Sequence, residues 1–249
     1  MTKDEYQKKI AKLFKGWKQK KPDGDINHPS SVFISDGIVN ENPEEWYSQE
    51  CRPLFLLREA YGGEHDWDLT DYVRSVADGK NKNHTWRNVA MWTYGILNTH
   101  AGDVLPAFPE YHKEADALSK NATTVPFDDQ LLQKIAVVNI KKSNGDPSSS
   151  DDDLMKYAKY DAKEIWEEIE LIDPTVIISA NATAIQDELA KKKGFKIERN
   201  HQDWTSRLEI NKHKVILIEY WHPANHFPNM MNYYTLTAFY ERALRALNK

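Results

Sequence analysis

The sequence predicts an α/β fold in which helices cover both faces of a mostly parallel sheet. Four short, continuous apolar runs, mostly rich in β-branched residues, occur along the chain. Segments with helical periodicity lie between most of these runs, so predicted strands and helices alternate. Strands that are apolar on both faces and are joined by helices are typical of βαβ units. We therefore expect a three-layer α/β/α architecture around a central, mostly parallel four-stranded sheet.

The four predicted strands are each followed by polar or turn-forming residues. They are expected at residues 53–57, 135–140, 175–179 and 214–220. The first stops at Arg58-Glu59, and the second runs into the loop Lys141-Lys142-Ser143-Asn144-Gly145. Runs of this length, bounded by loop residues, are better explained by buried strands than by helices.

Helical periodicity predicts the segments that cover this sheet. Apolar residues recur every three or four positions in the ranges 85–97, 154–172, 182–192 and 230–247. The second of these follows a serine- and aspartate-rich segment, 148–153, which is a typical helix start. Asp173-Pro174 ends that helix and leads into the third strand.

The N-terminal part of the chain differs from the rest in charge. Residues 1–22 contain eight lysines and two acidic residues, whereas the whole chain of 249 residues has 33 basic and 38 acidic residues. Ile10, Leu13, Phe14 and Trp17 have helical spacing there. We interpret residues 1–50 as a helical and loop-rich extension and residues 51–249 as the α/β domain. The lysine-rich helix is either a solvated helix packed on the domain or an arm that binds phosphate groups or a partner.

Composition excludes several classes of protein. A net charge of −5 argues against a protein that coats nucleic acid by charge alone. A mean hydropathy of −0.72 and the lack of a long apolar run predict no membrane-spanning helix. Cys51 is the single cysteine, and the first five residues form no apolar signal core, so we expect a soluble, cytoplasmic protein. The sequence has no glycine-rich phosphate loop, so we expect no nucleotide cofactor.

Polar side chains are found where three predicted strands end. Glu59 follows the first strand, Asn139 lies near the end of the second, and His222 follows the fourth. Ligands of open α/β sheets bind beyond the carboxyl ends of the strands. A carboxylate, an amide and an imidazole are therefore expected in one cleft, although each of them also has an ordinary structural explanation.

These three segments together resemble the motifs of the uracil-DNA glycosylase superfamily. Leu57-Arg58-Glu59-Ala60-Tyr61-Gly62-Gly63 is similar to its first motif, G-Q-D-P-Y-H-G. Val137-Val138-Asn139-Ile140 is similar to its central strand, and His222-Pro223-Ala224 to its closing H-P-S motif. The similarity extends over residues 53–235. It departs from the pattern where Glu59 replaces Asp and Ala60 replaces Pro.

The resemblance implies a role for each matching residue. Glu59 would orient or deprotonate a hydrolytic water, and Tyr61 would form the pocket wall beside the base. Asn139 would hydrogen-bond the Watson–Crick edge of a flipped base, and His222 would donate to the base as it leaves. The implied activity is hydrolysis of the N-glycosidic bond of uracil or a related damaged base in DNA, without metal or cofactor.

DNA is the partner that the resemblance implies, and few residues of this acidic chain are candidates for contacting it. Trp67 or Trp86 would stack on the flipped base, although Trp86 is more simply explained as a core residue. Lys141, Lys142 and the N-terminal arm are the remaining sources of positive charge. We therefore include Lys141 and Trp67 among the predicted substrate-binding residues.

Two alternatives to glycosylase chemistry remain open. A relative with the same fold can bind a nucleotide, nucleic acid or protein partner without catalysis, because fold does not determine function. Asp146 with Asp151-Asp152-Asp153 could form the site of a metal-dependent hydrolase, but acidic residues at a helix start are more simply explained by the helix dipole. His222 and His226 have metal-ligand spacing, but Pro223 makes a helix there improbable.

Overall fold

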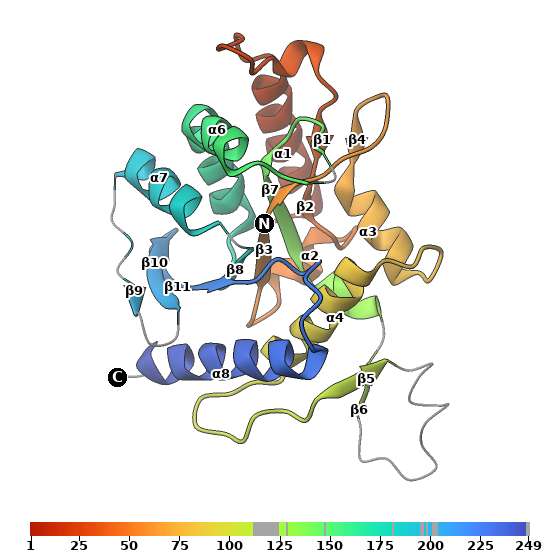
Figure 1. The fold of residues 1–249 in the computed structure, drawn as a ribbon, viewed down its shortest axis with the longest axis vertical. Coiled ribbons are helices and arrows are strands. Elements are labelled where there is room, and N and C mark those ends of the chain that lie inside the picture. Colours follow the sequence, from red (N-terminus) through yellow and green to blue (C-terminus); the bar gives the residue numbers. More distant parts are fainter. Residues whose placement is uncertain are drawn as a thin grey trace.

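The computed structural model of the chain contains one large mixed sheet with helices on both faces (Figure 1). It describes residues 1–111, 125–127, 129–146, 148–180, 182–194, 197, 199–200 and 204–247. Among these residues the sheet has seven strands in the order β2-β7-β3-β8-β11-β10-β9. The α/β class predicted from the alternation of strands and helices is confirmed.

The four central strands of the sheet are the four that the sequence predicts. They are β3 (Pro53–Glu59), β7 (Ala136–Lys141), β8 (Val176–Ala180) and β11 (His213–Tyr220). All three pairings between them are parallel. Leu57 pairs with Asn139 in the β3–β7 register, so the first two predicted site strands are direct neighbours.

The prediction of only four strands is wrong, because antiparallel strands extend both edges of the sheet. β2 (Gly37–Ile38) pairs with β7, and β10 (Thr205–Ile210) and β9 (Arg199–Asn200) extend the other edge. β10 joins β11 through Asn211 and Lys212, whose φ angles of 49° and 69° are typical of a tight hairpin turn. β2 and β9 have two residues each, too few to show a pattern in the sequence.

Two further pairs of short strands lie outside the main sheet. β1 (Ile34–Ser35) pairs with β4 (Trp67–Asp68), and β5 (Pro109–Tyr111) pairs with β6 (Val125–Phe127). The β1–β4 pair holds the loop after β3 close to the N-terminal part of the chain.

Helices cover the two faces of the sheet in separate sets (Figure 1). α3 (Leu69–Ala77), α4 (His84–Leu97) and α8 (Asn229–Leu247) pack on one face with the 3₁₀-helix η2 (Asp129–Lys134). α1 (Lys3–Lys18), α2 (Pro43–Tyr47), α6 (Asp151–Ile172) and α7 (Thr183–Lys193) pack on the other, near the 3₁₀-helix η1 (His28–Ser30). Successive strand residues alternate between the two cores, as a pleated strand requires.

The predicted helix positions agree closely with the structure, but two α-helices, α2 and α3, were not predicted. α4, α6, α7 and α8 begin and end within a few residues of the predicted ranges. Ser150 is the N-cap of α6, and its hydroxyl accepts the Asp153 N–H at 3.4 Å. α3 was not predicted, although Asp68 caps it and Leu69, Val73 and Val76 form its buried stripe. None of the described helices combines the length and apolarity that crossing a membrane requires.

Residues 1–50 share the core of the α/β domain. α1 buries Tyr6 and Trp17 against the α6 side of the sheet, and β2 belongs to the sheet itself. Two lysines near the end of this helix bind acidic residues of the domain. Lys18 pairs with Asp66, and Lys20 pairs with Asp161 at 2.9 Å. The structure therefore supports a packed helix rather than a detached arm.

Lys142 is a core residue and not a surface cation. Its side chain is fully buried, where it pairs with Asp36 and lies 2.7 Å from Glu168. Burial lowers the pKa of the Lys142 ammonium, but the two carboxyl groups outweigh this effect and raise the pKa overall. Burial, reinforced by the Asp36 charge, raises the pKa of Glu168 well above its usual value. The expectation that Lys142 supplies positive potential to nucleic acid is wrong.

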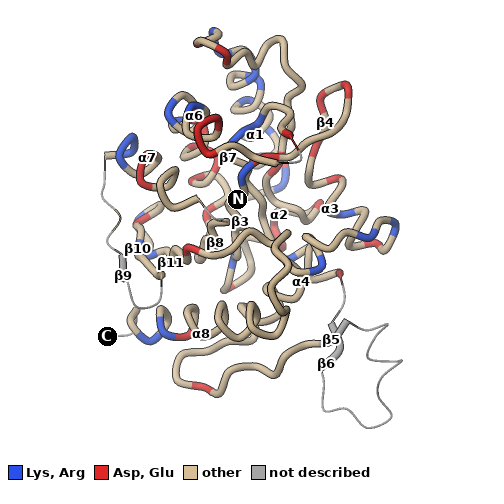
Figure 2. The backbone as a smooth tube through the Cα atoms, viewed as in Figure 1, with Lys and Arg blue, Asp and Glu red and all other residues tan. Residues whose placement is uncertain are grey.

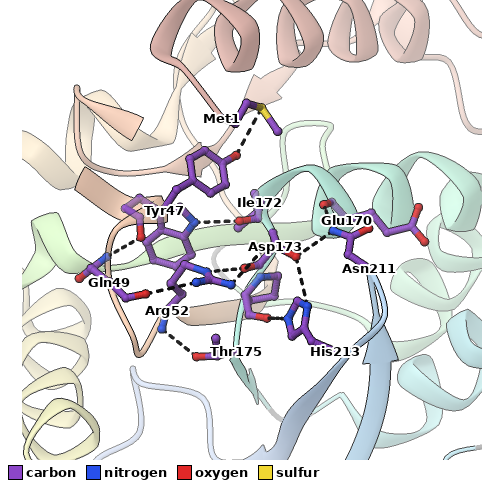
Figure 3. A network of polar contacts seen from close by, with 12 residues as sticks. Met1, Tyr47, Gln49, Arg52, Glu170, Ile172, Asp173, Thr175, Asn211 and His213 are labelled. Atoms are coloured by element: carbon purple, nitrogen blue, oxygen red, sulfur yellow. Dashed lines mark hydrogen bonds and ion pairs between the residues drawn. The ribbon is translucent and has the colours of Figure 1, made fainter. Parts of the chain in front are cut away.

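Side chains near the amino ends of the parallel strands bind the C-terminal end of the long helix α6 (Figure 3). The last carbonyl groups of a helix have no partner within it. Here Asn211 donates to the Glu170 carbonyl, Tyr47 to that of Leu171, and Arg52 to that of Asp173. Arg52 also binds the Asp173 carboxylate at 3.0 Å. The positive charge of Arg52 also interacts favourably with the negative end of the helix dipole, so the network stabilises the end of α6.

Candidate functional site

A cleft of about 740 Å³ opens at the carboxyl ends of the parallel strands. Five of the six residues predicted for the site line it: Glu59, Tyr61, Trp67, Asn139 and His222. Lys141 is not among the lining residues. A second cavity of about 650 Å³ shares Ser149, His222 and Ala224 with the first, so the two are adjacent. The carboxyl ends of the strands thus bring together residues that are up to 163 positions apart in the sequence.

Glu59 stands at the end of β3, facing Lys141 of β7. The Glu59 side chain is only 3% exposed, and its Oε2 lies 3.1 Å from the Lys141 Nζ. Lys141 also binds the Asp153 carboxylate at 2.6 Å. Burial lowers the pKa of the Lys141 ammonium, but Asp153 and Glu59 outweigh it and raise the pKa overall. The Lys141 ammonium therefore forms ion pairs with two carboxylates and is not free to bind a phosphate.

Gly145 lets the loop after β7 approach Glu59 closely. A Cβ atom at this position would fall on the Glu59 carboxylate. The Gly145 N–H also donates to the Ala60 carbonyl at 2.8 Å, which holds the two loops together. The close approach of this loop therefore requires glycine at position 145. The loop in turn restricts the positions that the Glu59 side chain can adopt.

Asn139 presents a buried amide to the cleft. The residue is 1% exposed, and its side-chain Nδ2 makes no hydrogen bond with any residue that the structure describes. Its backbone N–H donates to the Asp36 carboxylate at 2.7 Å, which fixes β7 at this point. Buried polar groups are almost always paired. Because Asn139 also lines the cleft, its unpaired amide is a candidate partner for a ligand.

His222 is held as a neutral imidazole. Its Nδ1 accepts the Ala224 N–H at 3.2 Å, so in the neutral ring the proton is on Nε2. Burial, helped by the charge of Arg58, lowers the pKa of His222 to about 4. Nε2 makes no hydrogen bond within the described part of the chain, which leaves an N–H donor for a ligand.

Asparagine side chains fix the loop that carries His222. Asn225 donates through Nδ2 to the His222 carbonyl at 2.8 Å and accepts the Asn232 Nδ2 at the same distance. Asn88 of α4 donates to the Pro223 carbonyl at 2.7 Å. These bonds tie the loop to α4 and α8. Residues 222–228 form turns and no helix, as Pro223 predicts.

Aromatic rings form the outer part of the cleft. Tyr61 is 58% exposed, whereas Trp86 is 5% exposed and packs in the core with one edge on the cleft. The Trp67 Nε1 donates to the Gly62 carbonyl at 2.9 Å, and a side chain at Gly63 would crowd the Trp67 ring. The Gly62-Gly63 turn, with φ angles of 102° and 83°, thus positions Trp67.

We expect His222 to titrate well below the usual range of histidine. An NMR titration should give an apparent pKa of about 4. The Arg58→Met variant should raise this pKa, because it removes a neighbouring positive charge, whereas Arg207→Met, on the far edge of the sheet, should not. In the unfolded chain His222 takes up its proton near pH 6.5. Its contribution to stability therefore decreases as the pH falls from about 6.5 to about 4. Titration near pH 6.5 in the wild type would contradict this assignment.

The acidic residues near the cleft start a helix, as expected. Asp151, Asp152 and Asp153 form the first turn of α6, and Arg58 pairs with Asp151. Among the described residues no three His, Cys, Asp or Glu side chains are grouped so that they could hold a metal ion. Asp146 lines the cleft as a separate residue.

Sequence reasoning missed the residues that support the site. Asp36, Asn88 and Gly145 each hold a predicted residue or its loop in place. Asp36 is 103 positions from Asn139, and nothing in the local sequence connects them. The sequence predicts a loop around Gly145, but the contact of Gly145 with Glu59 depends on the neighbouring strand.

No family model matches the sequence, and a search of curated proteins finds no significant match.

Proposed function

We propose that the cleft binds a nucleobase and hydrolyses the N-glycosidic bond that joins it to a sugar. Asn139 and His222 supply two hydrogen-bond donors to the base, Glu59 supplies a carboxylate, and Trp67 and Tyr61 supply rings for stacking. The resemblance to the uracil-DNA glycosylase superfamily implies uracil or a related damaged base in DNA. The proposal is supported by the position of these donors, the carboxylate and the rings on one cleft.

The proposed reaction needs no group besides water. The bond between the sugar C1′ and the base nitrogen breaks, and its electron pair leaves with the base. The N–H donors of Asn139 and His222 stabilise the negative charge that develops there. The Glu59 carboxylate balances the positive charge on the sugar and accepts a proton from the attacking water. The water oxygen bonds to C1′, and the released proton ends on the base.

The unpaired amide of Asn139 carries this proposal. Asn139 is 99% buried, and its unpaired donor lowers the stability of the protein unless a ligand or water accepts a hydrogen bond from it. It lies on the same cleft as Glu59 and the neutral His222. A carbonyl group of a nucleobase is a suitable acceptor for both donors.

Release of a free base tests the proposal directly. Oligonucleotides containing uracil, hypoxanthine or xanthine, and the matching deoxynucleosides, are incubated with the protein, and free base is measured by chromatography. We expect release by the wild type and about tenfold slower release by Asn139→Ala, the value of one buried hydrogen bond. Asn98→Ala, at the far end of α4, is the matched control. No release from any of these substrates would refute hydrolysis.

A second candidate function is binding of the base without chemistry. The ion pair of Glu59 with Lys141 and its 3% exposure favour this alternative, because both limit access of water to the carboxylate. In that case calorimetry would detect binding that Asn139→Ala abolishes, while no base is released.

A further inference from the structure

We infer that the cleft takes an uncharged nucleoside in preference to phosphate-bearing nucleotides or DNA. This inference rests on the proposed function, since it names the molecule that carries the base. It starts from the charges that line the two adjacent cavities, which differ from those expected at a nucleic-acid surface.

Acidic side chains dominate the charged residues of the cleft. The main cavity is lined by the carboxylates Glu59, Glu64, Asp66 and Asp146, and the adjacent cavity by Asp151 and Asp152. Among the described residues that line either cavity, Arg58 of the adjacent cavity is the single lysine or arginine, and it pairs with Asp151. Figure 2 shows acidic positions both at the start of α6 and in the loop before β4.

The cations nearest to the cleft are neutralised by carboxylates. Lys18 of α1 binds Asp66, which lines the cleft. Lys141 lies between Glu59 and Asp153. Lys142 is fully buried with Asp36 and Glu168. The positive charge that the sequence offers for DNA is therefore committed to contacts within the protein.

A phosphate group at this cleft would meet the three lining carboxylates that have no ion pair among the described residues, which are Glu64, Asp146 and Asp152. Proteins that bind nucleic acid neutralise phosphates with lysine and arginine, and their affinity decreases as salt is added. Here the same phosphates would be repelled, and added salt would weaken the repulsion by screening. A base and its sugar carry no such charge.

The remaining features of the cleft suit a small uncharged ligand. Its volume of about 740 Å³ lies within the range of small-molecule sites. The buried, unpaired amide of Asn139 gives it a polar anchor, and the rings of Trp67, Tyr61 and Tyr72 give it an apolar wall. These groups recognise a base, and none of them requires a phosphate.

Calorimetry of matched ligands tests the inference. Deoxyuridine and deoxyinosine are compared with their 5′-monophosphates and with single-stranded oligonucleotides carrying the same bases, at about 20 mM and about 200 mM salt. We expect the best nucleoside to bind about tenfold more tightly than its monophosphate at low salt, equivalent to 1.4 kcal/mol. The difference should shrink at high salt, while nucleoside affinity stays constant.

Variants that neutralise charge show whether electrostatic repulsion, and not the shape of the cleft, disfavours the phosphate. The Glu64→Gln/Asp152→Asn double variant removes two exposed carboxylates that have no ion pair among the described residues. We expect it to reduce the preference for nucleoside over monophosphate several-fold. Glu209→Gln/Asp103→Asn, with two exposed acids outside both cavities, should leave the preference unchanged.

The outcomes distinguish the two proposals. Tighter binding of the monophosphate or the oligonucleotide than of the nucleoside, with affinity that falls as salt rises, would overturn the nucleoside inference and leave base hydrolysis intact. Failure of every nucleoside, nucleotide and oligonucleotide to bind would refute the proposed function itself.

Discussion

Replacing Glu59 with glutamine is expected to slow base release by about 10²–10⁴-fold, the usual contribution of a general base. Glutamine has the same shape but cannot accept the proton of water or balance the charge on the sugar. Lys141 keeps Asp153 as a partner in this variant, so the fold should be preserved. The measurement is the single-turnover rate of base release, with binding of the nucleoside followed by calorimetry.

Two further variants show whether the position of the Glu59 carboxylate matters. Gly145→Ala keeps every charge but places a Cβ on that carboxylate, so it should also slow base release while circular dichroism stays unchanged. Glu209→Gln, an exposed change on β10, is the control and should have no effect. A Glu59→Gln protein that releases base at the wild-type rate would remove Glu59 from the mechanism.

The Lys142→Met variant is expected to lower the free energy of unfolding by about 3–5 kcal/mol, the typical cost of removing one partner from a buried ion pair. Methionine fills similar space but leaves Asp36 as an uncompensated buried charge. Asp36 also accepts the backbone N–H of Asn139, so the change should loosen β7 at the site. Urea denaturation followed by tryptophan fluorescence measures the effect.

Two control variants, both in α6, show whether the loss for Lys142→Met comes from its buried ion pair. Lys163→Met removes an exposed i,i+4 pair with Glu167 and should cost no more than about 0.5 kcal/mol. Glu168→Gln should also cost little, because burial raises the pKa of Glu168 and favours its neutral form, which glutamine resembles. A loss for Lys142→Met as small as that for Lys163→Met would contradict the buried-charge account.

The raised pKa of Glu168 also predicts a pH dependence. The native state holds the Glu168 proton at pH values where the unfolded chain, with a carboxyl pKa near 4.5, has already lost it. Stability from this group therefore decreases as the pH rises above about 4.5. The Glu168→Gln variant should lose this part of the pH dependence.

Local sequence patterns are sufficient to predict the four central strands and the helices α4, α6, α7 and α8. Strands buried on both faces appear as continuous apolar runs, and the helices appear as helical spacing of apolar residues. Glu59, Asn139 and His222 were found for the same reason, because each lies where such a strand ends. β2 and β9 escaped because two residues carry no pattern, and α3 escaped although its cap and stripe were present.

The pairing of polar groups depends on how the chain folds and cannot be read from the sequence. Lys141 and Lys142 are neighbours in the sequence, yet one joins Glu59 and Asp153, and the other is buried with Asp36 and Glu168. Their partners are 12 to 106 positions away, and local periodicity contains no information about such distances. The charge of the cleft follows from these pairings, because a cation already held by a carboxylate attracts no phosphate. Composition gave the net charge of the chain, but packing determined where that charge remains uncompensated.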